Sequence, residues 1–152
     1  QWPGQPLRVV LDSQLRTAPA AAVVQGEGEV LILHAAADAS PRAAALTAAG
    51  ARVERIAAAA DGLDLAAVLE RLAALEINEV LVEAGPTLAG AFVQAGLVDE
   101  LVIYLAPHLM GHDGSPLLRL PGIVSMKQRL PLRILDVRMV GTDLRVRARL
   151  EK

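Results

Sequence analysis

The sequence predicts an α/β fold in three layers: a mixed, mostly parallel sheet with helices on both faces and a C-terminal antiparallel hairpin. Short aliphatic segments alternate with helical patterns up to about residue 95, and this alternation is typical of parallel βαβ units with right-handed crossovers. Beyond residue 131, two alternating segments flank Gly141-Thr142-Asp143, which is the pattern of a hairpin. A length of 152 residues is sufficient for one hydrophobic core, so a single domain is expected.

The first half of the chain contains three predicted strands and a helix between the second and third. The strands are short segments dense in β-forming residues: Leu7 to Leu11, Val30 to Leu33 and Arg52 to Ile56. The helix is predicted from Pro41 to Ala49, because Ser40 is a suitable N-cap and Gly50 a suitable stop.

A second helix is predicted after Asp64, which suits its N-cap. Its apolar residues recur at helical spacing and share one face: Leu65, Val68, Leu69, Leu72 and Leu75. Two further strands are predicted, at Glu79 to Val82 and at Glu100 to Ala106. Residues 107–131 are rich in proline and glycine and are expected to form loops. Leu132 to Val140 and Leu144 to Leu150 then form the terminal hairpin.

The stretch from Val80 to Phe92 is the most informative for function. An apolar strand ends on the carboxylate of Glu83, and Gly85-Pro86-Thr87 then opens a helix of small residues. A helix N-terminus presents unpaired backbone N–H groups and the positive end of the helix dipole, which together accept phosphate. Glycines at 85 and 90 would let a ligand approach the backbone closely. The pattern indicates a phosphate-binding turn for a nucleotide cofactor, with Glu83 facing a polar substrate beside it.

The residues alone leave a second interpretation open. The Gly85–Gly90 spacing lacks the Lys-Ser/Thr of a P-loop and the three-glycine spacing of a dinucleotide-binding fingerprint. In this interpretation the glycines only permit a tight turn and close packing of the helix against the sheet, and Glu83 caps the turn. The spacing does not decide between the two.

Two motif blocks resemble a known family. One comprises Val82–Gly90, Gln94–Leu101 and Tyr104–Pro107, followed by Gly111, and the other is Arg8–Thr17. In this order they resemble the reductase domain of the bacterial bifunctional riboflavin-biosynthesis deaminase/reductase, over nearly the whole chain. The resemblance implies a dihydrofolate-reductase-like fold and NADPH-dependent reduction of 5-amino-6-(5-phosphoribosylamino)uracil to the ribitylamino product.

The resemblance also implies roles for individual residues. Glu83 matches a residue that contacts the substrate near the nicotinamide, and Ser13 matches a cofactor contact. The pyrophosphate-binding segment of the family matches seven consecutive residues: Gly85, Pro86, Thr87, Leu88, Ala89, Gly90 and Ala91. Arg16 is a weaker phosphate candidate, since an arginine in a turn is more often solvated. No residue is assigned as catalytic, and the preference for NADPH over NADH rests on the resemblance alone.

Composition argues against several other functions. The formal net charge is −2 with no basic patch, so a nucleic-acid partner is not expected. The chain has neither an 18-residue apolar run nor a signal-like start, and we expect a cytoplasmic protein without membrane contact. Cysteine is absent and the three histidines lack metal-ligand spacing, so neither a metal nor zinc-dependent deaminase chemistry is expected.

The sequence also leads to expectations about association with a second subunit and about how much of the family's domain residues 1–152 contain. The arginines of the second hairpin strand (Arg145, Arg147 and Arg149) are expected to be solvated or to contact a second subunit. Because family members associate through their reductase domains, a homodimer is expected. The family's domain carries a strand–helix–strand portion before the segment matching Arg8–Thr17, so residues 1–152 are expected to be a fragment that binds NADPH with weak or absent activity.

Two alternatives stay open: a catalytically silent, reductase-like domain kept for oligomerisation or nucleotide binding, and the same fold acting on another pteridine-like or pyrimidine substrate.

Overall fold

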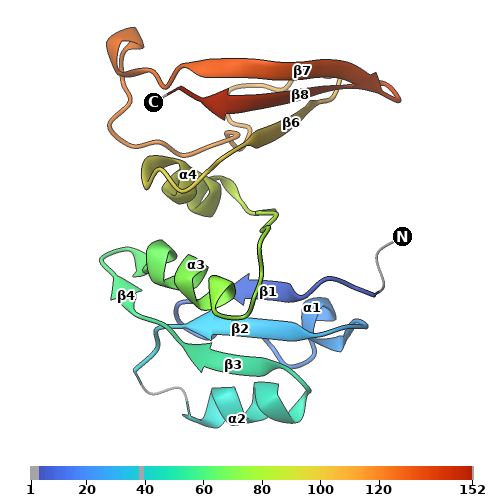
Figure 1. Ribbon diagram of the computed structural model, residues 1–152, viewed down its shortest axis with the longest axis vertical. Helices are drawn as coiled ribbons and strands as arrows, with labels where there is room; N and C mark the ends of the chain where they lie inside the picture. The colour runs from blue at the N-terminus through green and yellow to red at the C-terminus, as the bar shows by residue number, and fades with distance from the viewer. Residues whose placement is uncertain (1–3, 38–39, 152) are drawn as a thin grey trace. The chain divides into compact units, whose positions relative to one another are not determined.

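The computed structural model describes residues 4–37 and 40–151 (Figure 1). They form two compact units that meet in the sequence between Glu79 and Val80. The first unit contains these elements: β1 (Arg8–Leu11), α1 (Ala22–Gln25), β2 (Val30–His34), α2 (Ser40–Ala48), β3 (Arg52–Arg55), β4 (Ala58–Ala59), β5 (Gly62–Leu63) and α3 (Leu65–Ala73). The second contains α4 (Pro86–Gln94), β6 (Leu101–Leu105), the 3₁₀ turn η1 (Met126–Gln128), β7 (Leu132–Val140) and β8 (Asp143–Leu150).

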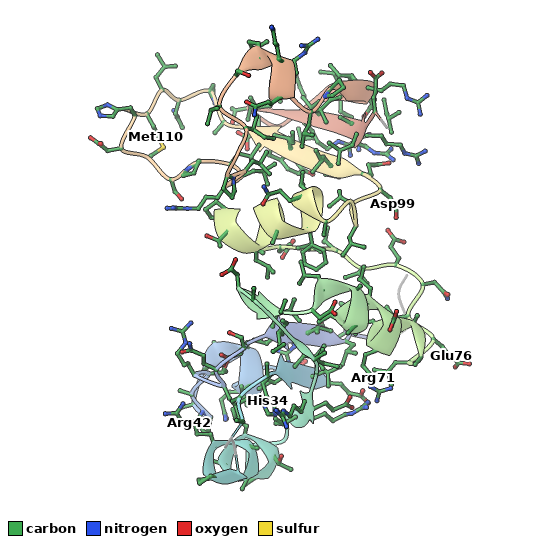
Figure 2. All side chains as sticks on the ribbon, turned by 90° about the vertical axis from the view of Figure 1, so that its left-hand side faces the viewer. His34, Arg42, Arg71, Glu76, Asp99 and Met110 are labelled. Carbon is green, nitrogen blue, oxygen red and sulfur yellow. The ribbon has the colours of Figure 1, made fainter. Side chains whose placement is uncertain are left out.

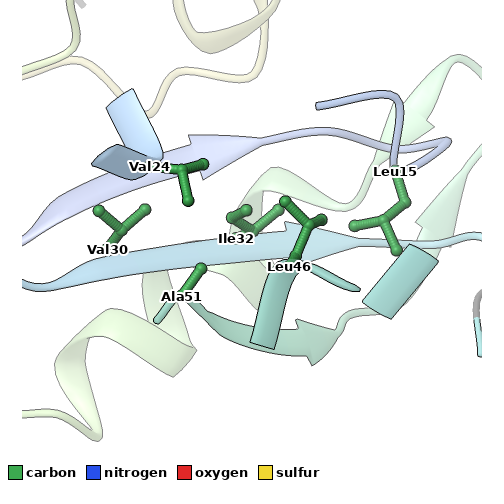
Figure 3. Close-up of a cluster of buried hydrophobic side chains, with 6 residues drawn as sticks. All are labelled: Leu15, Val24, Val30, Ile32, Leu46 and Ala51. Carbon is green, nitrogen blue, oxygen red and sulfur yellow. The ribbon is translucent and has the colours of Figure 1, made fainter. Parts of the chain in front are cut away.

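The first unit is built on a parallel sheet in the order β1–β2–β3. Every residue of the central strand β2 is buried, because successive side chains of a strand point to opposite faces and both faces are covered. Ile32 packs on the α2 side with Leu46, in the cluster of Figure 3. Leu31 and Leu33 pack on the other side, against Val68 and Leu72 of α3. Helices therefore cover both faces of this sheet (Figure 1).

Both predicted helices of the first unit are present. The Asp64 carboxylate caps α3 by accepting hydrogen bonds from the backbone N–H groups of Ala66 (3.0 Å) and Ala67 (3.1 Å). Helix α2 runs from Ser40 to Ala48, one residue earlier at each end than predicted. It is followed by Gly50 at φ +96°, a conformation that glycine adopts without strain. The predicted capping by the Ser40 side chain lies outside the part of the chain that the structure describes.

The second unit is built on an antiparallel sheet in the order β6–β8–β7. The β7–β8 turn places Gly141 at φ +61°, and the hairpin register pairs Val137 with Val146 and Arg138 with Arg145. Apolar and charged side chains of β8 therefore alternate between faces, as predicted. The parallel sheet with helices on both faces and the C-terminal hairpin confirm the α/β class. The single domain over residues 1–152 stays a prediction.

The predicted strand from Glu79 to Val82 is wrong. Within the described residues 4–37 and 40–151, no strand pairs with this segment, and Val80, Leu81 and Val82 are 41%, 76% and 40% exposed. Its residues favour an extended backbone, but a strand also requires a partner that supplies ladder hydrogen bonds. The short helix α1 and the β4–β5 hairpin were not predicted, because elements of four and two residues show no measurable periodicity.

Candidate functional site

The turn from Gly85 into α4 has the form expected of an anion-binding helix N-terminus. Gly85 is the N-cap (φ −66°, ψ 166°), Pro86 is the first helical residue, and no side chain caps the helix. The first intrahelical bond runs from the N–H of Ala89 to the carbonyl of Gly85 (3.1 Å), so the N–H groups of Thr87 and Leu88 have no partner within the helix. A Cβ built on Gly85 would meet no atom within 4 Å. This turn is therefore open to a ligand.

Gly90 has a different environment from Gly85. It is buried, and a Cβ at this position would overlap the carbonyl oxygen of Arg119 and lie 2.9 Å from the carbonyl carbon. The N–H of Arg119 in turn donates to the carbonyl of Pro86 (2.9 Å). Close packing of residue 119 against α4 is thus sufficient to require glycine at position 90, so the packing interpretation applies there. A cofactor contact by Gly90 stays a prediction.

Glu83, the predicted substrate-binding residue, follows the extended segment instead of ending a strand. Its side chain is exposed. Within residues 4–37 and 40–151 it has no hydrogen-bond or ion-pair partner. The carboxylate is therefore available to a ligand, and the interpretation of Glu83 as a cap of the Gly85 turn has no support, since the N-terminus of α4 lacks a side-chain cap.

Ser13 lies in the first unit, in a loop that Asp12 organises. The Asp12 carboxylate accepts hydrogen bonds from the backbone N–H (2.6 Å) and hydroxyl (2.7 Å) of Thr17. Burial raises the pKa of Asp12, but hydrogen bonds from Arg16 and Thr17 and the charge of Arg16 outweigh it, so that its pKa is lowered. The Ser13 carbonyl accepts from the N–H of Ala35 (3.1 Å). Sequence reasoning missed Asp12, whose signal is an acidic residue directly after a strand with a threonine five residues later.

The predicted site residues are divided between the two units. Glu83 and residues 85–91 are neighbours in the second unit, whereas Ser13 belongs to the first. Within the predicted pyrophosphate-binding segment, Gly85 and Thr87 are exposed, while Leu88, Ala89 and Ala91 are half-buried. The exposed end of this segment is therefore its N-terminal turn.

The hairpin arginines, expected to be solvated or at a subunit contact, form ion pairs within their own sheet. Arg147 donates to Glu100 (2.5 Å) and Arg145 to Asp136 (2.6 Å). The hydrogen bond from Arg147 lowers the pKa of Glu100. Across the described residues, no three His, Asp or Glu side chains are grouped in a way that could hold a metal ion. In the same part of the chain, no helix is both long and apolar enough to cross a membrane.

Comparison with known proteins identifies the family. The sequence model of the RibD C-terminal domain matches residues 2–146. The chain belongs to the RibD C-terminal domain family. It is 39% identical over 140 residues to the riboflavin biosynthesis protein RibD of Escherichia coli, an alignment that covers 92% of this chain and 37% of the relative. It is 27% identical over 143 residues to the 5-amino-6-(5-phosphoribosylamino)uracil reductase of Buchnera aphidicola, covering 93% and 66%.

Solved structures of the RibD family share the fold. Acinetobacter baumannii RibD matches with a TM-score of 0.80 at 29% identity, over 95% of this chain and 37% of the matched chain. A pyrimidine reductase-like protein from Corynebacterium diphtheriae matches with a TM-score of 0.75 at 18% identity, which shows the fold alone. The chain thus has a RibD reductase-type fold, and it spans 37% of the length of the E. coli RibD protein.

Proposed function

We propose that this chain is a reductase domain of riboflavin biosynthesis that reduces 5-amino-6-(5-phosphoribosylamino)uracil to the ribitylamino product with NADPH. Family membership supports the reaction, since relatives carry the names RibD and 5-amino-6-(5-phosphoribosylamino)uracil reductase. The observation in this chain that carries the proposal is the open, uncapped N-terminus of α4 at Gly85, two residues after the unpartnered carboxylate of Glu83. The setting that we propose is the cytoplasm.

Each part of this segment has a task in the proposed reaction. When bound, NADPH supplies the hydride that reduces C1′ of the substrate. The N–H groups of Thr87 and Leu88 donate to its pyrophosphate, and glycine at 85 lets the pyrophosphate approach the backbone. Reduction of an imine at C1′ also places a proton on the attached nitrogen. Glu83 orients this nitrogen by accepting a hydrogen bond from the N–H of the protonated imine, or relays the proton to it.

The pyrophosphate site is tested with Gly85→Val, measured by fluorescence titration of NADPH. We expect at least a tenfold loss of affinity with the fold intact, because the valine side chain enters open space where the pyrophosphate is proposed to lie. Gly111→Val is the matched control, since a Cβ at Gly111 also meets nothing within 4 Å and the residue is outside the proposed site. Equal affinities of wild type and folded Gly85→Val would remove the pyrophosphate site from the proposal.

The catalytically silent alternative predicts a different outcome in a second assay. A silent domain would bind NADPH, with Gly85→Val weakening binding, but would not oxidise NADPH in the presence of the phosphoribosylaminouracil substrate. We expect substrate-dependent oxidation from the full-length protein, and a large loss of the rate in Glu83→Gln. Full activity of Glu83→Gln would exclude a role for this carboxylate.

The second unit also supports a proposal of a symmetric homodimer. On the apolar face of its sheet, Ile134, Val137 and Met139 of β7 are 62%, 49% and 61% exposed, although they pair with half-buried or buried residues of β8. Contiguous apolar surface of this kind is typical of an interface. We expect a dimer in analytical ultracentrifugation that Ile134→Glu dissociates and Arg133→Glu, on the opposite face, does not. A monomeric wild type at high concentration would refute this proposal.

A further inference from the structure

The chain segment around Arg119 lies along α4. In the first turn of α4, the carbonyl of Pro86 accepts a hydrogen bond from the backbone N–H of Arg119 (2.9 Å). In the last turn, Nε2 of Gln94 donates to the carbonyl of Pro121 (2.9 Å). Between these two bonds, the carbonyl of Arg119 packs directly against Gly90. The backbone of residue 119 is therefore held beside the N-terminal half of the helix.

The hydrogen bond from Arg119 is made to the peptide group that joins Pro86 to Thr87. The carbonyl of this group accepts from Arg119, whereas its N–H, on Thr87, has no partner within the helix. Because hydrogen bonds in a chain polarise one another, the bond from Arg119 makes the N–H of Thr87 a stronger donor. The backbone of Arg119 is thus separated from the proposed pyrophosphate site by one peptide group, a distance shorter than an extended arginine side chain.

The side chain of Arg119 is exposed and forms no ion pair among the described residues 4–37 and 40–151. It belongs to the loop between β6 and β7. Figure 2 shows Met110 of this loop on the opposite side of the second unit from Asp99, which follows α4. In contrast, Arg145 and Arg147 of the same unit are paired with carboxylates of their own sheet. The guanidinium group of Arg119 is therefore available to a ligand.

The proposed pyrophosphate site requires a cation that α4 itself does not supply. Helix α4 contains no charged residue, and no lysine or arginine occurs from residue 72 to residue 118. A helix N-terminus is equivalent to only about half a positive charge. Each phosphate of a pyrophosphate is negatively charged, and the carboxylate of Glu83 adds a further negative charge nearby. Arg119 is the basic residue whose backbone is bonded to the first turn of α4, so it is placed to balance these charges.

Resting on the proposed function, we propose that the guanidinium group of Arg119 binds the pyrophosphate of NADPH and supplies the positive charge that α4 lacks. A guanidinium donates two parallel hydrogen bonds to phosphate oxygens, in addition to the backbone N–H groups of Thr87 and Leu88. The phosphate of the substrate offers the same chemistry to Arg119. The cofactor is favoured because the backbone of Arg119 is bonded to the peptide group whose N–H is proposed to hold the pyrophosphate.

Calorimetric titration with NADPH and with adenosine 2′-monophosphate, which lacks the pyrophosphate, tests this proposal. We expect Arg119→Gln to weaken NADPH binding about tenfold and to change the affinity for adenosine 2′-monophosphate less than twofold. Arg119→Lys, which keeps the charge, should recover part of the loss, and added salt should narrow the difference between wild type and Arg119→Gln. Arg129→Gln is the matched control, because Arg129 is exposed in the same unit and donates to the carbonyl of Met126 in its own turn (2.8 Å). The contacts of residue 119 with α4 are made by its backbone, so the variants should fold, which circular dichroism checks.

The outcomes separate this inference from the proposed function. If Gly85→Val weakens NADPH binding but folded Arg119→Gln binds NADPH as the wild type does, the inference fails and the proposed function stands. If Arg119→Gln loses binding of ribose 5-phosphate and keeps that of NADPH, Arg119 serves the substrate and the inference is wrong. An equal loss of affinity for NADPH and adenosine 2′-monophosphate would also overturn it, since the effect would not depend on the pyrophosphate. If the folded wild type does not bind NADPH, both the inference and the proposed function fail.

Discussion

Replacing Gly90 by alanine tests whether packing, and not helix propensity, determines this position. In an exposed helix interior, Gly→Ala stabilises a protein by about 1 kcal/mol. Here the added methyl group would overlap the backbone carbonyl of Arg119. The obstacle is backbone, so no side-chain rotation relieves it. The segment around residue 119 must move away from α4, or the helix must shift.

The expected magnitude follows from three terms. Overpacking of this kind costs about 1–3 kcal/mol. Moving residue 119 also breaks the hydrogen bond from its N–H to the carbonyl of Pro86 (2.9 Å), worth about 0.5–1.5 kcal/mol. The gain in helix propensity offsets about 1 kcal/mol. We therefore expect Gly90→Ala to lower the free energy of unfolding by roughly 0.5–3.5 kcal/mol.

Urea denaturation followed by circular dichroism measures this change, with Gly85→Ala as the control. Gly85 has φ −66° and open space at its Cβ position, so its replacement meets no steric obstacle and should cost less than about 1 kcal/mol, the preference for glycine over alanine at an N-cap. A Gly90→Ala variant as stable as the wild type, or more stable, would refute the packing argument. It would also show that residue 119 does not lie against α4 as described.

Three further predictions concern the first unit. The hydrogen bond from Arg71, opposed by burial and assisted by Arg52, lowers the pKa of Glu54 from 4.5 to about 2. The ionised Glu54 carboxylate therefore stabilises the folded state fully above pH 4.5, and this stabilisation is lost as the pH falls towards 2. The free energy of unfolding of Glu54→Gln should thus depend less on pH than that of the wild type between pH 4.5 and 2. If urea denaturation gives parallel curves of this free energy against pH for the two proteins, the prediction is wrong. Asp64→Ala removes the cap of α3 and should lower the free energy of unfolding by about 1 kcal/mol; an unchanged urea midpoint would count against a role for the cap. Asp12→Ala removes the acceptor of both Thr17 hydrogen bonds and should cost about 1.5–3 kcal/mol, with faster amide exchange at Thr17; unchanged exchange would show that another contact orders the loop.

Local patterns predicted most of the elements, because these depend on neighbours in the chain. The cap at Asp64, the face of α3 with Val68 and Leu72, and the alternation of β8 all arise from side-chain spacing along one element. The first helical proline at 86 and the start of α4 follow from the same local chemistry. The residue pattern therefore also predicted where an anion could meet a helix N-terminus.

The segment from Glu79 to Val82 shows where local patterns fail. Its residues prefer extended backbone, yet whether they form a strand depends on a partner strand elsewhere in the chain, which no local pattern encodes. The two glycines show the same limit. Both occur in one motif, but only the backbone of Arg119, 29 positions after Gly90, gives Gly90 its packing role and leaves Gly85 open.

By itself, the sequence determined the α/β class, the hairpin, the helix start at Pro86 and the family resemblance, because these rest on periodicity, caps and motif order. Only the tertiary structure decided that Arg42 reaches the carbonyl of Gln14 and that Asp12 orders the loop through Thr17. Gln14 and Arg42 are separated by 28 positions and by strand β2. Their contact is created by the parallel sheet, which places the loop after β1 and the start of α2 at one edge.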